Sequence, residues 1–434
     1  MKTIGFLASM FGAVLLSSSL CSCSNDDNEP AGTPVTPGGD TPPEVVEETG
    51  LTEELESVYN QDINDFAFNA LRTLAARNDG SSLVFSPVSA ASVLAMLNDG
   101  AAGQTRQELL SVLGFGQAST KALNEYFLKL LVTAPEADPT TTLHLANAVF
   151  ADKDCTFRQS FIEDMNQFYH AESAALDFAS PAAVEYINSW CERQTEGLIP
   201  VFLNALSPDF RSILLNAMYF RGKWVTPFIS KSTSSRTFYL EDGTEKEVDM
   251  MYNDKWEGNL NRYCETDSFQ AVRMAYGQGS YAMTVILPKK DVATVSDILG
   301  RLNAGSWQEL GSRLKRPSEL LSIGLPRFTI TTSDAAENLS GVLQSMGAAT
   351  LFSSSAELPG ILEGINLPVS EIKQKAIIRV TEEGTEAAVV TGSMILIDDP
   401  DEPVIIYFRA DHPFVYVISD VNTGVVYFAG TYQG

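Results

Sequence analysis

Residues 382–403 read EEGTEAAVVTGSMILIDDPDEP and lie between two strand-like runs. Gly384 near the start and the acidic, proline-containing Asp398–Pro403 at the end are typical of a loop. From Thr385 to Ile395, however, every second residue is small or apolar and uncharged, as in a strand with one buried face. A connection this long without helical periodicity is usually functional or disordered. The stretch fits both a loop and a strand, although an ordinary edge strand followed by an acidic turn would explain it equally well.

The rest of the chain carries helical patterns mainly in its first half and strand patterns mainly in its second. Apolar residues recur at helical spacing from Ile63 to Leu74 and the helix is expected to end by Gly80, while Ser86-Pro87 begins another helix. This order predicts an α+β fold rather than alternating α/β. The expected strands are Thr142–Phe150, Ile213–Phe220, Gln270–Tyr276, Tyr281–Leu287, Ile377–Thr381, Val404–Phe408, Phe414–Ile418 and Val425–Phe428.

The chain begins with the features of a bacterial lipoprotein signal peptide, which we place at residues 1–22. Lys2 is followed by an apolar run that is too interrupted for a membrane span. A small residue immediately precedes Cys23 and a leucine stands three before it, so we expect Cys23 to be lipidated. Cys21 fits less well, because Leu20 would occupy the small position. The alternative is an ordinary secretory signal with free cysteines.

An acidic tether is expected over residues 23–50. Residues 24–50 contain five Pro, four Gly and seven acidic residues but no basic one, a composition that cannot bury apolar area. As a flexible coil the segment would reach about 30 Å. Residues 51–434 then form a single folded domain. The acidic residues directly after Cys23 resemble the export tag of some surface lipoproteins, which predicts an outer-membrane lipoprotein exposed at the cell surface, touching the membrane only through its lipid.

Composition excludes several classes of function. The formal net charge of −26 repels nucleic acid and heparin-like polyanions, so neither is an expected partner. Five cysteines and three histidines lie at no spacing that suggests a metal site or a disulfide framework. No nucleophile elbow, phosphate-binding loop, zinc-protease motif or dinucleotide fingerprint occurs, and His144 and His412 have simpler structural explanations. We therefore expect neither an enzyme nor a cofactor.

Five sequence blocks, taken in order, resemble the serpin family. One block alone would be weak evidence, but five in the family's order across residues 55–434 are specific. The blocks are Phe85–Ser89 with Leu94–Leu97 and Gly100-Ala101, Asn216–Trp224 with Pro227-Phe228, Leu325–Phe328, Glu382–Ala388, and Asp411–Phe414. The resemblance implies a serpin fold of about three β-sheets with eight or nine helices and an exposed reactive-centre loop. It also implies a monomer.

The resemblance implies an inhibitor of serine proteases, with cysteine proteases as a second class of target. In serpins the loop acts as a substrate: a protease attacks it and forms an acyl-enzyme. The cut loop then inserts as a strand into the main sheet and carries the protease with it. The residues agree with this mechanism, because the uncharged alternate set suits a buried strand and Gly384 to Asp398 spans about 46 Å when extended. The alternative function is a non-inhibitory surface binding protein with a serpin fold.

The resemblance also assigns residues to two regions of the mechanism. The loop hinge comprises Glu383, Gly384, Thr385, Glu386, Ala387 and Ala388. Ser86, Ser89 and Asn216 match residues that line the zone where the main sheet opens, and Trp224 matches one beneath the point of first insertion. Gln374 stands where many relatives have a histidine, and it still donates and accepts hydrogen bonds.

The position of the reactive bond is less defined. Family spacing from the hinge places it between Asp398 and Asp399, which suits Asp-specific proteases. One residue less places it after Ile397, which suits elastase-like enzymes, and Leu396 and Met394 are further candidates. Heparin-binding serpins use a basic helix, and this acidic chain offers none, so we expect no polyanion cofactor.

Overall fold

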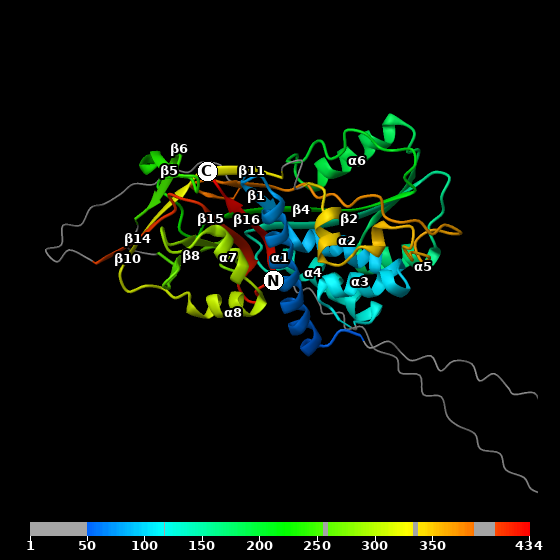
Figure 1. Cartoon of the computed structure of the whole chain (residues 1–434), viewed down its shortest axis with the longest axis horizontal. Helices are drawn as coiled ribbons and strands as arrows, with labels where there is room; N and C mark the ends of the chain where they lie inside the picture. Colours follow the sequence, from blue (N-terminus) through cyan, green and yellow to red (C-terminus); the bar gives the residue numbers. More distant parts are fainter. Residues whose placement is uncertain (1–49, 117, 255–258, 333–336, 386–403) are drawn as a thin grey trace, which may run out of the picture. The chain divides into compact units, whose positions relative to one another are not determined.

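The computed structural model describes residues 50–116, 118–254, 259–332, 337–385 and 404–434. These residues contain nine α-helices and two short 3₁₀ helices. Figure 1 shows how the labelled helices and strands are arranged. The α-helices are α1 (Glu53–Arg77), α2 (Pro87–Gly100), α3 (Gly103–Leu113), α4 (Thr120–Glu136), α5 (Gln159–Tyr169), α6 (Pro181–Gln194), α7 (Val295–Arg301), α8 (Ala304–Arg313) and α10 (Ser340–Met346). The 3₁₀ helices are η1 (Ser230–Ser232) and η2 (Thr350–Phe352).

The strands form three sheets. The six-stranded main sheet has the order β11 (Phe328–Thr331), β12 (Ile377–Val380), β13 (Gly384–Thr385), β4 (Ser212–Lys223), β2 (Thr142–Asp152), β3 (Glu172–Leu176). The second sheet has the order β1 (Leu83–Phe85), β16 (Val426–Tyr432), β15 (Phe414–Asp420), β9 (Tyr281–Pro288), β8 (Phe269–Tyr276), β7 (Arg262–Glu265). The third has β14 (Ile405–Arg409), β10 (Leu320–Pro326), β6 (Glu245–Asn253) and β5 (Ser234–Tyr239). The predicted α+β fold with three sheets and eight or nine helices is confirmed.

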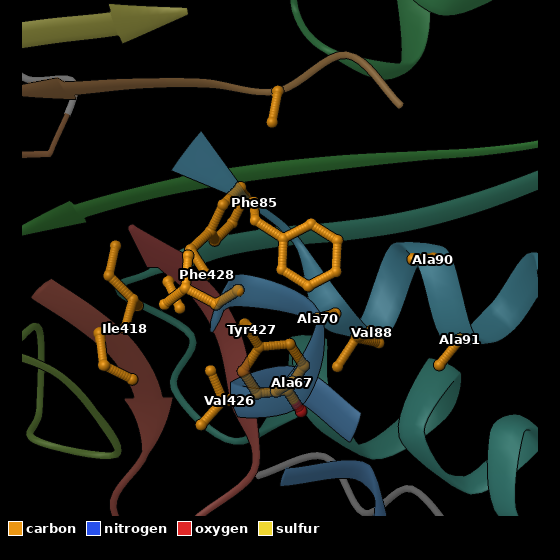
Figure 2. Packing of buried hydrophobic residues seen from close by; sticks show 14 of the residues in the cluster. Ala67, Ala70, Phe85, Val88, Ala90, Ala91, Ile418, Val426, Tyr427 and Phe428 are labelled. Carbon is orange, nitrogen blue, oxygen red and sulfur yellow. The ribbon is translucent and has the colours of Figure 1, made fainter. Parts of the chain in front are cut away.

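The core lies where α1 and α2 pack on the second sheet. Every residue of β9, β15 and β16 is buried, because helices and other strands cover both faces of this sheet. Small residues on the two helices allow a close approach to the large side chains of the strands. Figure 2 shows Ala67, Ala70 and Val88 of the helices beside Tyr427 of the strands, with Phe85 and Phe428 nearby in the same cluster.

Local sequence signals explain where several helices begin and end. The side chain of Thr52 caps α1, and three glutamates in the first turn complement the helix dipole. Ser86 caps α2 by accepting a hydrogen bond from the Ser89 backbone N–H, and Pro87 occupies the first turn, as predicted. Helix α1 ends at Arg77, three residues before Gly80, because the Asn78 backbone already leaves the helical conformation.

Candidate functional site

Strand β4 of the main sheet is hydrogen-bonded to a different extent along its two edges. Toward β2, β4 is hydrogen-bonded along most of its length, from the Arg221–Thr142 pair to the Ser212–Ala151 pair (Figure 1). Toward β12, within the described residues, only its last two residues have a ladder partner, which is β13. A two-residue strand therefore closes the sheet at one end, and below it the β4 edge is unpaired among the residues that the structure describes.

Glycine is required at the first position of this short strand. Gly384 pairs with Lys223 of β4, and the two backbones approach so closely that a Cβ at Gly384 would lie 2.1 Å from the Gly222 carbonyl oxygen. Any other residue would displace the backbone from the sheet. The predicted hinge residues Glu383, Gly384 and Thr385 thus lie in or beside the main sheet, while Glu386, Ala387 and Ala388 lie outside the described residues.

Thr385 is almost fully buried, with 2% of its surface exposed, and its Oγ1 lies 2.7 Å from the Tyr276 hydroxyl. Burial raises the pKa of Tyr276 well above its usual range, so this phenol stays protonated, and either of the two hydroxyls can donate in the hydrogen bond between them. Sequence reasoning missed Tyr276, which is 109 residues away along the chain and carries no local signal of a role at the hinge.

Trp224 packs against Tyr276 and is hydrogen-bonded to the backbone just before the hinge. Its ring stacks on Tyr276 with the centroids 4.2 Å apart, and its Nε1 donates a hydrogen bond of 2.9 Å to the Thr381 carbonyl. The Trp224 backbone N–H donates to the carbonyl of Glu383 over 2.8 Å. This single residue therefore contacts the chain on both sides of the turn that leads into β13. Its place beneath the point of first insertion stays a prediction.

Glu382, immediately before the hinge, is buried and held by side chains of two other segments. Its Oε1 accepts a 2.7 Å hydrogen bond from Thr233 and lies 3.6 Å from an Nη1 of Arg327. Arg327 also pairs with Asp249 of β6 at 2.5 Å, so Glu382 is tied to the third sheet. Sequence reasoning missed this cluster, although Arg327 belongs to the Leu325–Phe328 block.

The residues assigned to sheet opening fall into two hydrogen-bonded groups. Gln374 is buried, and its amide accepts from the Ser86 N–H at 2.9 Å and donates to the Ser86 carbonyl at 2.7 Å. Asn216 instead donates to Asn147 over 2.8 Å. Ser89 is buried on the first turn of α2 and joins the first group through its backbone N–H. The structure therefore brings Ser86, Ser89 and Gln374 together.

The second group contains Asn216, which was predicted, and Asn147, which was not. Asn147 accepts hydrogen bonds from Asn216 and from the Ser92 hydroxyl, and its own amide donates to the Tyr169 carbonyl at 2.8 Å. The Oδ1 of Asn216 is buried and has no hydrogen-bond partner among the described residues. Asn147 lies inside a predicted strand, but nothing in its sequence context distinguishes it from other strand residues.

The sequence of the chain matches a known family over nearly all of the folded region. Residues 61–433 match the family described as Serpin (serine protease inhibitor). The chain belongs to the serpin family. Relatives include an uncharacterised serpin-like protein of Thermococcus kodakarensis, 33% identical over 88% of this chain and 86% of that protein, and Iripin-2 of Ixodes ricinus, 33% identical over 85% and 91%. The predicted resemblance is confirmed.

Solved serpin structures share the fold. The native state of the thermophilic serpin tengpin superimposes with a TM-score of 0.77 at 25% identity, covering 90% of this chain and 96% of that one. The structure titled cleaved Serpin 42Da gives a TM-score of 0.76 at 26% identity, covering 88% and 99%. Serpins are mostly protease inhibitors rather than catalytic enzymes.

The described part of this serpin includes Cys191 and His412. It holds no group of three His, Cys, Asp or Glu side chains suited to a metal ion. Burial raises the pKa of the Cys191 thiol to about 12, so it is not a thiolate nucleophile. His412 is engaged by the Asp411 carboxylate at 2.7 Å and the Pro288 carbonyl at 2.6 Å. The predicted reactive-bond residues Leu396, Ile397, Asp398 and Asp399, and the predicted lipidation site Cys23, lie outside the described residues.

Proposed function

We propose that this serpin inhibits proteases as a suicide substrate, through insertion of its cut loop between β4 and β12. The observation that carries the proposal is the position of β13. Gly384 and Thr385 already pair with β4 on one side, and Thr385 pairs with Val380 of β12 on the other. Below them the β4 edge, from Ser212 to Arg221, has no ladder partner among the described residues on the side of β12, and we call this edge the slot.

The first step is ordinary acyl transfer. The active-site serine hydroxyl of the protease attacks the carbonyl carbon of Asp398, or of Ile397 in the alternative register. The bond to the next nitrogen breaks, the new amine takes the proton lost by the serine, and an ester joins the loop to the protease. A cysteine protease would form a thioester in the same way. Serine proteases of Asp-specific or elastase-like preference are the proposed targets.

If the pairing of β13 with β4 continues along the loop, the inserted loop residues face buried parts of β4. Each step forward along the loop corresponds to one step back along β4, so Ala387 would come opposite Phe220 and Thr391 opposite Asn216. Phe220 is buried on the face of β4 that packs on the core, so the loop residue beside it must be small and uncharged. The unpartnered Asn216 Oδ1 would receive the Thr391 hydroxyl as a donor.

An apolar pocket of about 140 Å³ lies at the far end of the slot. The same register brings Met394 and Ile395 opposite Ile213 and Ser212, at the start of β4. These loop residues are apolar, like most of the side chains that line the pocket, which also include the charged Asp209, Arg211, Glu371 and Lys373. The pocket is lined by Leu97, Phe210, Ile213, Leu215, Leu358 and Ile372, among others.

A covalent complex tests the proposal. The purified chain is mixed with elastase-like, trypsin-like, subtilisin-like and Asp-specific proteases and boiled in detergent. We expect a stable band of serpin plus protease with at least one of them, and mass spectrometry of the released C-terminal peptide to identify the bond. Cleavage within residues 394–399 by several proteases, with neither a band nor a change in thermal stability, would favour the non-inhibitory binding protein instead.

We further propose that the chain is an outer-membrane lipoprotein anchored through Cys23 and displayed at the cell surface. The support is the sequence around Cys23 and the acidic tether after it. The test is mass spectrometry of the N-terminal peptide from the membrane fraction, with Cys23→Ser as the comparison. A diacylglycerol on Cys23 that is absent from the variant is expected, and an unmodified Cys23 would contradict the proposal. Protease shaving of intact cells separates outward from periplasmic orientation.

A further inference from the structure

The pocket at the far end of the slot is an enclosed cavity rather than an exposed apolar face. Its walls come from α2, from the connection between α6 and β4, from the start of β4 and from the segment after η2. Leu358, Ile361, Leu362 and Ile372 are each only 5% or 6% exposed, so these walls are shielded from bulk water. Leu367 is 50% exposed and marks the side on which the pocket opens to solvent.

The volume of the pocket suits one small ring. It measures about 140 Å³, and leucine, isoleucine and phenylalanine side chains make up most of its lining. An apolar cavity of about 150 Å³ with the same kind of lining binds a single benzene molecule. A molecule of two fused rings would need the walls to move apart, which a close-packed interior resists.

The charged groups of the lining favour a neutral ligand. The Nζ of Lys373 lies 3.3 Å from the Glu371 carboxylate, and the Arg211 guanidinium donates to two carbonyls of its own connection. Asp209 adds a second carboxylate, so two basic and two acidic side chains balance. An ion would therefore gain no net attraction, and its charge would lose water on entering an apolar cavity.

Hydrogen-bonding groups lie on one wall of the pocket. The hydroxyls of Ser212 and Ser370 line it, and each can donate or accept. The slot also begins at Ser212, where backbone groups on the side of β12 have no ladder partner within the described residues. An apolar lining with a few polar groups is typical of small-molecule sites, because the polar groups fix the orientation of the ligand.

We propose that this pocket binds a neutral one-ring molecule that carries a single hydroxyl or amide group. The ring lies among the leucine and isoleucine side chains, and the polar group faces the start of β4. Binding needs no protease, so the inference goes beyond the proposed function. Residues 212–215 belong both to the pocket lining and to the slot. A bound ring and a strand inserted along that edge therefore exclude each other, a consequence that rests on the proposed function.

Binding of p-cresol to the uncut full chain tests the proposal. This probe combines one ring with one hydroxyl, and 4-methylbenzoate keeps the ring and the methyl group but adds a charge. We expect p-cresol to raise the unfolding midpoint with saturation. In calorimetry it should bind roughly tenfold more tightly than 4-methylbenzoate. Equal affinities, or no saturable binding of p-cresol, would overturn the proposal.

Two substitutions locate the bound ring. Leu206→Trp places a larger side chain in the pocket and should weaken p-cresol binding roughly tenfold. Ile365→Ala enlarges the pocket, so 2-naphthol should gain affinity relative to p-cresol. The matched control is Leu240→Trp, because Leu240 is half-buried in the turn between β5 and β6, away from the pocket lining, and should leave both affinities unchanged. Unfolding midpoints without ligand show that each variant folds. Unchanged binding in both pocket variants would contradict the assigned site.

Trapping experiments separate this inference from the proposed function. With a protease that the chain traps, saturating p-cresol should lower the ratio of covalent complex to cleaved serpin, and an unchanged ratio would contradict the exclusion of the inserted strand. A chain that binds p-cresol in the pocket but forms no covalent complex with any protease that cuts its loop would refute the proposed function and leave the binding site standing.

Discussion

The hydroxyl of Thr385 lies 2.7 Å from the hydroxyl of Tyr276, and both side chains are buried. This contact joins the loop hinge to the end of β8 in the second sheet. Trp224 stacks on the same tyrosine ring and also binds the Thr381 carbonyl. Tyr276 at the end of β8 and Trp224, which directly follows β4, thus hold the hinge in the main sheet before any protease has acted.

Replacing Thr385 with arginine should abolish trapping. The site is buried, so the guanidinium would have to leave the sheet or lose its hydration, and either outcome opposes insertion of the strand. We expect Thr385→Arg to be cut at the same bond as the unaltered chain but to give no covalent band. Thr385→Ser keeps the hydroxyl at the same place and should trap normally. A covalent band of ordinary intensity from Thr385→Arg would contradict the assigned hinge.

Removing the Tyr276 hydroxyl should weaken the attachment of the hinge to the sheet while the aromatic ring stays in place. Tyr276→Phe keeps the stacked ring but deletes one buried hydrogen bond, which costs about 1 kcal/mol of unfolding free energy in urea. Amide hydrogen exchange at Gly384 and Thr385 should become faster. Tyr416→Phe is the matched control, because the buried Tyr416 hydroxyl donates to the Leu83 carbonyl in the second sheet. It should cost similar stability and leave exchange at the hinge unchanged.

The pairing of Gln374 with Ser86 should contribute measurably to stability. Gln374→Ala leaves the buried N–H and C=O of Ser86 without the amide, and each such group costs about 1–3 kcal/mol. Gln374→His retains a donor or an acceptor and should lose less. Urea unfolding of the three chains checks the order. Equal unfolding free energies for Gln374→Ala and the unaltered chain would show that the sheet does not depend on this contact.

Asp62 on α1 should make stability depend on pH in a defined window. Burial, together with the nearby charge of Asp65, raises the pKa of Asp62 to about 6 from 3.8. Between these values the folded chain holds a proton that the unfolded chain releases. The contribution of Asp62 therefore favours folding below about pH 4 and is lost as the pH rises through 6.

Asp62→Asn removes this titration. The stability of the variant relative to the unaltered chain should therefore increase between pH 4 and pH 7, as measured by urea midpoints at both values. Glu54→Gln, an exposed carboxylate on the same helix, should show a smaller change. A relative stability of Asp62→Asn that is the same at both pH values would contradict the prediction.

Much of the fold could be predicted from local patterns, and some could not. All eight predicted strands lie in the three sheets, because continuous or alternating apolar runs mark strands with a buried face. Strand β6 was missed because charged residues begin it: Glu245, Lys246 and Glu247 are all exposed. Alternation appears only over its last residues.

The candidate site shows the same limit. Family motifs led to Trp224, Gly384 and Gln374, and each of them makes specific contacts in or beside the main sheet. The partners of these residues were not predictable, because Tyr276 and Thr385 are 109 residues apart and Gln374 and Ser86 are 288 apart. Contacts between such distant residues depend on how the sheets pack, which no local spacing records.

Hydrogen–deuterium exchange along β4 tests the central claim most directly. In the intact chain the β4 edge toward β12 is unpaired below Gly222 among the described residues, so backbone N–H groups of residues 212–221 on that edge should exchange readily. After a single cut within residues 394–399, insertion of the loop pairs those groups, and we expect their exchange to slow by orders of magnitude. Unchanged exchange over residues 212–221 in the cut chain would contradict loop insertion.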